Sequence, residues 1–200
     1  MIKAIAFDYG GVIETIEGGV VQNVTKYLNI KEEDWRSVYS SLNYLCNTGQ
    51  KSYEEVYELV AKKLGASDSQ IAGAIEIFKK NRDTIEINFK LVELIKKLKS
   101  SYKIGLLSNN TIKLRQELTD LNLIDLFDVV VISSEEGYQK PQPEIFEILF
   151  KKLGVKSSEV IFVDDSRTSL VGAERIGYTP ILFLSNDQLK AELKKFSITL

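Results

Sequence analysis

The sequence predicts an α/β fold in which helices flank a parallel sheet of five main strands, with a small all-helical unit inserted after the first strand. From about residue 84 onward, short apolar runs alternate with helical patterns, which is typical of strand–helix–strand units. Residues 20–82 instead show helical patterns without a convincing strand. We therefore expect a Rossmann-like core, residues 1–14 and 84–200, and a helical cap unit, residues 15–83.

The first strand is predicted from the almost wholly apolar residues 2–7, which end on Asp8 and a pair of glycines. Such a run is typical of a central strand that is covered on both faces. In open α/β sheets ligands bind at the carboxyl ends of strands, and Gly10 and Gly11 let the backbone approach a ligand closely. Asp8 is therefore placed to carry out chemistry, or else it only caps the turn after the strand.

Apolar residues at helical spacing predict the helices of the inserted unit. They are Trp35, Val38, Tyr39, Leu42 and Leu45, then Val56, Leu59, Val60 and Leu64, then Ile71, Ile75 and Phe78. Ser52 and Glu55 match a capping box at the start of the second group. This pattern predicts a small helical core, and its aromatic residues are numerous enough to line a pocket as well.

Four further apolar runs predict the remaining strands, and polar residues follow three of them. The runs are residues 103–107, 128–132, 160–163 and 180–184, and the polar residues are Ser108, Asn109 and Asn110, then Ser133 and Ser134, then Asp164 and Asp165. Lys140 precedes a helix in which Pro143 suits the first turn. Each of these residues could be a helix cap or a surface charge. Because the loops open onto one edge of a parallel sheet, their joint arrival favours a functional site.

The composition excludes several classes of protein and site. The chain has no histidine, which rules out Ser-His-Asp and Cys-His nucleophilic sites and leaves oxygen ligands, for which Mg²⁺ is the natural metal. A net charge of −2 argues against a nucleic-acid partner. A single cysteine, Cys46, permits no intrachain disulfide and favours the cytoplasm. The absence of a signal-peptide pattern or a long apolar run argues against export and against a membrane association.

Taken together, these residues resemble the haloacid dehalogenase-like hydrolases, a superfamily dominated by Mg²⁺-dependent phosphatases that work through an aspartyl-phosphate. The motifs that carry the resemblance are Phe7-Asp8-Tyr9-Gly10-Gly11-Val12, Leu107-Ser108-Asn109, Lys140-Pro141 and Val163-Asp164-Asp165, followed by Gly172-Ala173 and Gly177. The helical unit resembles the type-1 cap of that family, a lid over the catalytic edge.

The resemblance implies a role for each motif residue. Asp8 would be the nucleophile that attacks phosphorus. The implied ligands of Mg²⁺ are Asp8, the backbone carbonyl of Gly10, Asp164 and, directly or through water, Asp165. The implied phosphate-binding groups are the Gly11 amide, the Ser108 hydroxyl, the Asn109 amide and the Lys140 ammonium, which also has a catalytic role.

Gly10 departs from the family pattern, which usually has a second Asp at this position as general acid and base. Such a group contributes about 10²–10⁴-fold to rate, and Glu14 and the tyrosines of the cap are the candidates to replace it.

We expect a phosphatase of a small phosphorylated metabolite, as a monomer or homodimer. The alternatives are a phosphate- or protein-binding module without turnover and, less favoured because of the acidic metal site, a 2-haloacid dehalogenase.

Overall fold

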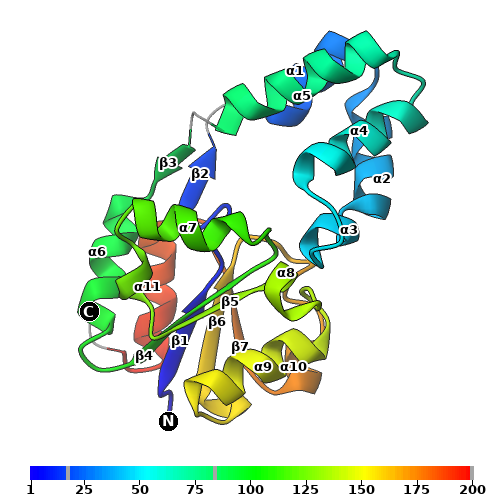
Figure 1. Ribbon diagram of the computed structural model, residues 1–200. Coiled ribbons are helices and arrows are strands. Elements are labelled where there is room, and N and C mark those ends of the chain that lie inside the picture. The colour runs from blue at the N-terminus through cyan, green and yellow to red at the C-terminus, as the bar shows by residue number, and fades with distance from the viewer. Residues whose placement is uncertain (17–18, 83–84, 199–200) are drawn as a thin grey trace.

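A computed structural model describes residues 1–16, 19–82 and 85–198, and a five-stranded parallel sheet forms the middle of the core (Figure 1). The strands are Ala4–Phe7 (β1), Lys103–Ser108 (β4), Val129–Ile132 (β5), Val160–Asp164 (β6) and Thr179–Leu182 (β7). They lie in the order β5-β4-β1-β6-β7, and each neighbouring pair is parallel. The predicted α/β fold with a five-stranded parallel sheet is confirmed, with β1 at its centre.

Helices cover both faces of this sheet, and the alternating side chains of β1 show why. Ile5 and Phe7 are fully buried in a cluster with apolar residues of α6 (Phe89–Leu98), α7 (Lys113–Asp120) and α11 (Asn186–Lys195). Ala4 and Ala6 point to the opposite face, where α9 (Pro143–Leu153) and α10 (Ala173–Ile176) pack. Their small side chains allow Phe146 of α9 to lie fully buried in the same cluster.

Residues 20–82, here called the helical insertion, pack around an apolar cluster of their own (Figure 1). Its helices are Val20–Leu28 (α1), Glu32–Leu42 (α2), Tyr44–Asn47 (α3), Tyr53–Lys63 (α4) and Asp68–Arg82 (α5). Trp35 is fully buried, with its ring 5.2 Å from that of Tyr57 in an edge-on contact. The capping box of Ser52 and Glu55 is present. The apolar pattern that ran from Trp35 to Leu45 is divided between α2 and α3, because α2 ends before Asn43.

A short antiparallel ribbon connects the helical insertion to the core. It consists of β2 (Glu14–Ile16) and β3 (Ile85–Ile87), whose end residues Ile16 and Ile85 are paired. Asn88 fixes the base of the ribbon, since its amide N–H donates to the carbonyl of Ile13 at 2.9 Å and its side chain donates to that of Val12 at 3.2 Å. The segments entering and leaving the insertion therefore lie side by side (Figure 1).

One loop of the core differs from the sequence-based expectation, and the loop after β6 is longer than a simple helix cap. Ser133 and Ser134, expected only to follow a strand, begin the short helix α8 (Ser133–Glu136). The segment after Asp165 forms turns, and a helix begins only at Ala173. Short 3₁₀ helices at Ile124–Leu126 (η1) and Ser157–Glu159 (η2) precede β5 and β6. Among the helices in the described part of the chain, none is both long and apolar enough to cross a bilayer.

Candidate active site

Three carboxyl groups meet where β1 and β6 end. The two strands pair in register up to Phe7 and Val163, and the amide of Asp8 donates to the carbonyl of Val163 at 2.8 Å. This register places Asp8 beside Asp164, because residues in register on parallel strands leave the sheet at the same edge. Asp165 follows directly, and one carboxylate oxygen from each of the three aspartates lies within 4.8 Å of the others.

Lys140 inserts its ammonium group between two of these carboxylates. Its Nζ lies 2.8 Å from Asp8 Oδ1 and 2.6 Å from Asp164 Oδ2, and the lysine side chain is 1% exposed. The ring of Phe162 lies beneath the ammonium, with its centroid 5.3 Å away. One positive charge thus faces up to three negative ones in a buried setting, where unbalanced charge is costly.

The pKa values of the aspartates reflect this imbalance. Burial, which is the largest effect, and the charge of Asp164 together outweigh the attraction of Lys140 and raise the pKa of Asp8 to about 7. Desolvation and the charge of Asp164 also raise the pKa of Asp165. A divalent cation at this cluster would favour the ionised carboxylates, since a bound cation is usually the largest local charge.

The motif at the end of β4 holds the backbone of Lys140, whereas the aspartates contact its ammonium group. Ser108 is the last residue of β4 and is 2% exposed. The side chain of Asn109 donates through Nδ2 to the Lys140 carbonyl at 3.1 Å and accepts from the Lys140 amide through Oδ1 at 2.8 Å. This contact was not predicted, because the resemblance assigns Asn109 a role through its own backbone amide.

The two glycines that follow Asp8 and Tyr9 differ in their surroundings. Gly11 has a positive φ of 73°, and a Cβ there would lie 2.2 Å from Asp165 Oδ2. Its amide donates to the Glu14 carbonyl at 2.7 Å, so the phosphate contact predicted for this amide requires that hydrogen bond to open. Gly10 is exposed, and a Cβ added there would meet no atom of the described residues within 4 Å.

Comparison with known proteins identifies the family. A family model described as haloacid dehalogenase-like hydrolase matches residues 2–177, which is most of the chain. The protein belongs to the haloacid dehalogenase-like hydrolases. The predicted family is therefore confirmed, and the protein is a hydrolytic enzyme.

Two curated relatives of this hydrolase match it over most of their length. A D-ribitol-5-phosphate phosphatase from Bacteroides thetaiotaomicron is 26% identical over 194 residues, covering 89% of this chain and 90% of that protein. A sesquiterpene phosphatase from Aspergillus oryzae is 26% identical over 180 residues, covering 88% and 86%. A haloacid dehalogenase-family enzyme from B. thetaiotaomicron, solved with magnesium and inorganic phosphate, shares the fold with a TM-score of 0.68 at 24% identity, over 94% of this chain and 99% of that one.

In this hydrolase the helical insertion contacts loops of the core at the edge of the sheet that carries the three aspartates. Asn47 Nδ2 donates to Gln139 Oε1 at 2.9 Å, and the Tyr53 hydroxyl lies 3.4 Å from Asn110 Oδ1. A hollow of about 260 Å³ lies between the two parts. Its lining comprises Cys46, Gly49, Lys51, Ser52, Tyr53 and Glu54 from the insertion and Thr111, Ile112, Lys113 and Ser134 from the core. The Ser134 hydroxyl is buried there without a hydrogen-bond partner among the described residues.

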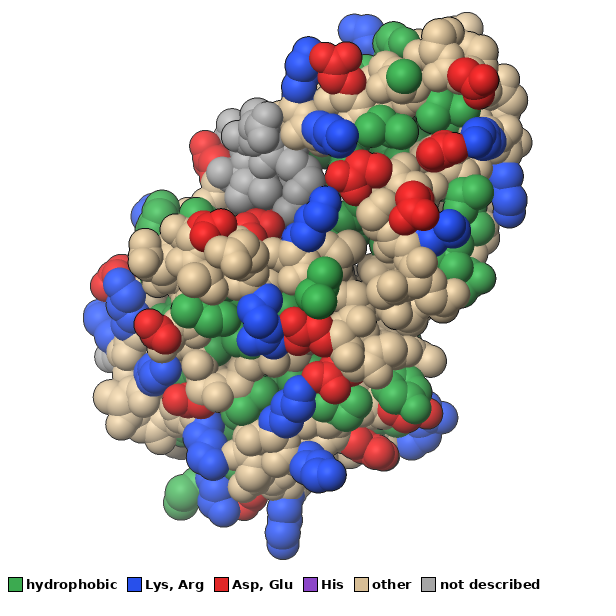
Figure 2. All heavy atoms as spheres, in the orientation of Figure 1, with side chains coloured by type: hydrophobic (Ala, Val, Ile, Leu, Met, Phe, Trp, Pro, Cys, Tyr) green, Lys and Arg blue, Asp and Glu red, His purple; other side chains and the backbone are tan. Residues whose placement is uncertain are grey.

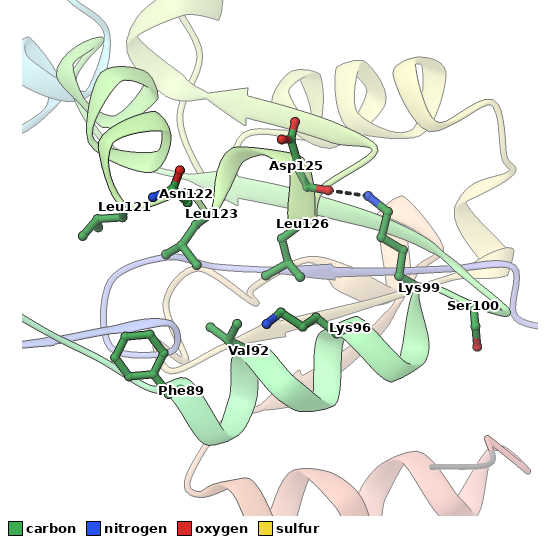
Figure 3. Close-up of a pocket in the computed structure, with 10 residues that line it drawn as sticks. All are labelled: Phe89, Val92, Lys96, Lys99, Ser100, Leu121, Asn122, Leu123, Asp125 and Leu126. Atoms are coloured by element: carbon green, nitrogen blue, oxygen red, sulfur yellow. Dashed lines mark hydrogen bonds between the residues drawn. The ribbon is translucent and has the colours of Figure 1, made fainter.

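A larger groove of about 570 Å³ lies elsewhere, between α6 and η1 (Figure 3). Val92 from α6 faces Leu123 and Leu126 across it, and Lys99 donates to the Asp125 carbonyl at 2.7 Å. None of the ten lining residues belongs to the predicted site. On the face drawn in Figure 2, acidic and basic side chains are interspersed over both the core and the insertion.

Proposed function

We propose that this hydrolase is a Mg²⁺-dependent phosphatase that acts on a small phosphorylated metabolite through an aspartyl-phosphate. The observation that carries the proposal is the group of three carboxyl groups around Lys140 at one edge of the sheet. The names of the relatives, a ribitol-phosphate phosphatase and a sesquiterpene phosphatase, support the reaction class. They name different substrates, so the proposal extends to the phosphate group and to no particular metabolite.

The donor set suits Mg²⁺, which prefers oxygen ligands and retains several waters. Asp8, Asp164 and Asp165 offer carboxylate oxygens within 4.8 Å of one another, and the Gly10 carbonyl is the proposed fourth protein ligand. Bound Mg²⁺ would neutralise charge between the carboxylate nucleophile and the phosphate. Residues 15–83 would act as the cap unit that covers this site.

The chain's own groups would then perform two displacements. In the first, a carboxylate oxygen of Asp8 forms a bond to phosphorus while the bond from phosphorus to the substrate oxygen breaks, and the alcohol leaves. In the second, water attacks phosphorus, which releases inorganic phosphate and regenerates the carboxylate. Ser108, the Asn109 amide and the Lys140 ammonium would bind the phosphate oxygens and stabilise their charge in both steps.

Gly10 offers no side chain to protonate the leaving alcohol. Of the candidates named from the sequence, Glu14 is 3% exposed at the start of β2, and Tyr53 is the tyrosine of the insertion whose hydroxyl lies beside Asn110. We propose that Tyr53 or Glu14 assists proton transfer, or that the substrate has a leaving group that needs little assistance.

The decisive test is hydrolysis of an activated aryl phosphate with and without Mg²⁺, by the native protein and by Asp8→Asn. We expect turnover that requires the metal and that falls by at least about 10³-fold in Asp8→Asn, which keeps the shape of the side chain but removes the nucleophile. Native protein that binds phosphate without turnover would instead favour a binding module. Halide release from a 2-haloacid without Mg²⁺ would favour the dehalogenase alternative.

A further inference from the structure

One hydrogen bond joins the helical insertion to the residue that precedes Lys140. Asn47, at the end of α3, donates from Nδ2 to the side-chain oxygen of Gln139 at 2.9 Å, although 92 residues separate the two. Asn47 is 7% exposed and Gln139 is half-buried, so this hydrogen bond is partly shielded from water. A shielded hydrogen bond loses more when broken than an exposed one, because water does not readily replace the lost partner.

Gln139 belongs to a turn that is closed on itself. The Gln139 amide donates to Gln142 Oε1 at 2.7 Å, and the Gln142 amide donates to the Gln139 carbonyl at 2.8 Å. Between them, Lys140 has both backbone groups hydrogen-bonded to the Asn109 side chain. Hydrogen bonds within residues 139–142 therefore hold this turn together, so that a displacement of Gln139 also moves Lys140.

The position of Lys140 matters because its ammonium makes two short contacts at once. It lies 2.8 Å from Asp8 Oδ1 and 2.6 Å from Asp164 Oδ2. A shift of about 1 Å in such a constellation can cost a large part of the rate. A group that fixes the position of residues 139–142 relative to the strand ends can therefore affect the reaction rate without touching the substrate.

We infer that Asn47 is a positioning residue, which aligns Lys140 with Asp8 through Gln139 when the insertion lies over the sheet edge. The inference rests on the proposed function for its kinetic consequence. It gives closure of the insertion a second effect besides covering the site, since the lysine becomes fully aligned only when Asn47 is in place. An opened insertion would leave Lys140 held by Asn109 alone on its backbone side.

The chain offers a matched control in a second contact between insertion and core. Glu54 Oε1 lies 3.4 Å from Lys113 Nζ across the same junction, and neither residue contacts residues 139–142 through a hydrogen bond or ion pair described in the structure. Glu54→Gln therefore perturbs the junction without perturbing the link to Lys140. The Lys140 amide, which donates to Asn109 Oδ1, is a direct reporter of order in residues 139–142.

The experiment compares Asn47→Leu, Gln139→Met, the double variant and Glu54→Gln. Measurements are kcat and KM on an aryl phosphate, and hydrogen–deuterium exchange of the Lys140 amide. We expect Asn47→Leu and Gln139→Met each to lower kcat by about two- to tenfold with a smaller change in KM, and to speed exchange of the Lys140 amide. The double variant should be no worse than either single one, since both remove one interaction. Glu54→Gln should leave kcat and this exchange rate within about twofold of the native values.

The inference would be overturned if Asn47→Leu kept the native kcat and the native exchange rate of the Lys140 amide. It would also be overturned if the losses of kcat in the two single variants added up in the double variant, or if Glu54→Gln lost as much kcat as Asn47→Leu. The exchange measurement does not depend on turnover. If the native protein hydrolyses no phosphate, the proposed function fails, while faster exchange of the Lys140 amide in Asn47→Leu still supports the mechanical link and unchanged exchange still refutes it.

Discussion

Asn109 clamps the backbone of Lys140 at two points, with its Nδ2 on the lysine carbonyl and its Oδ1 on the lysine amide. The two residues lie 31 positions apart, in loops that follow neighbouring strands. The clamp makes Asn109 responsible for the direction in which the lysine side chain enters the site. An asparagine suits this position because its amide offers one donor and one acceptor in a fixed geometry.

Replacement of Asn109 by leucine is expected to lower kcat/KM on an aryl phosphate by roughly tenfold or more. The physical reason is the loss of two hydrogen bonds, each contributing about 0.5–1.5 kcal/mol, from a buried segment. Urea unfolding should show a matching loss of stability. The control is Asn23→Leu, which removes an exposed hydrogen bond to Asn81 within the insertion and should leave activity unchanged. Native activity in Asn109→Leu would show that other contacts suffice to hold Lys140.

Lys140→Met should destabilise the metal-free protein by about 3–5 kcal/mol, because it leaves Asp8 and Asp164 as buried carboxylates without their cation. Excess Mg²⁺ should restore part of this loss if the ion binds the same carboxylates. The measurement is urea unfolding in chelator and in Mg²⁺. Lys113→Met is the control, since its ammonium pairs with Glu54 at a largely exposed site and should cost at most about 1 kcal/mol. Equal losses with and without Mg²⁺ would argue against a metal at this cluster.

The raised pKa of Asp8 predicts how the stability of the metal-free protein depends on pH. The folded-state pKa of about 7 lies above the ordinary value of 3.8, so the folded chain binds this proton more tightly than the unfolded chain does. The resulting stabilisation is complete below about pH 4 and is lost as the pH rises to about 7. Asp8→Asn, which stays neutral, should therefore raise the melting temperature least near pH 4 and most above pH 7.

Thermal unfolding of both proteins in chelator, from pH 4 to 8, measures this effect. Each kcal/mol corresponds to about 2–4 °C for a chain of this size. A gain from Asp8→Asn that does not grow with pH would mean that Lys140 keeps the carboxylate ionised in the folded state throughout this range.

Gly10→Asp should be accommodated in the fold, because a Cβ at Gly10 has open space around it. If general acid help is what the native site lacks, turnover of poor leaving groups should rise by about 10²-fold or more. Gly11→Ala is the neighbouring control: its Cβ would meet Asp165 at 2.2 Å and its φ is positive, so it should lose about 1–2 kcal/mol of stability and weaken Mg²⁺ binding. A loss of turnover in Gly10→Asp would indicate a working site that is built around glycine.

The parts of the site that sequence reasoning could place are those at strand ends. Asp8 and Asp164 follow apolar runs, and runs of this kind in alternation with helices predict parallel strands with a shared edge. Their proximity therefore follows from local signals plus one topological rule. The family resemblance then added roles for Ser108 and Lys140, and these roles stay predictions.

The parts that could not be predicted depend on pairs of residues without a local signal. Nothing in the sequence near Asn47 indicates that it meets Gln139, because the contact depends on how the insertion sits on the core. The three-residue strands β2 and β3 are too short for an alternating pattern to be recognised. The hydrogen bond that occupies the Gly11 amide depends on the tight return of the chain from Tyr9 to Glu14.

The ribbon of β2 and β3 has a further consequence for protein engineering. Because Ile16 and Ile85 face each other as an antiparallel pair, a two-residue turn of the Asn-Gly type could join them directly into a hairpin. Such a deletion would remove the helical insertion without separating the two halves of the core. The same junction is a suitable place to insert a different domain, so the ribbon makes the proposed cap unit replaceable without a change to the core.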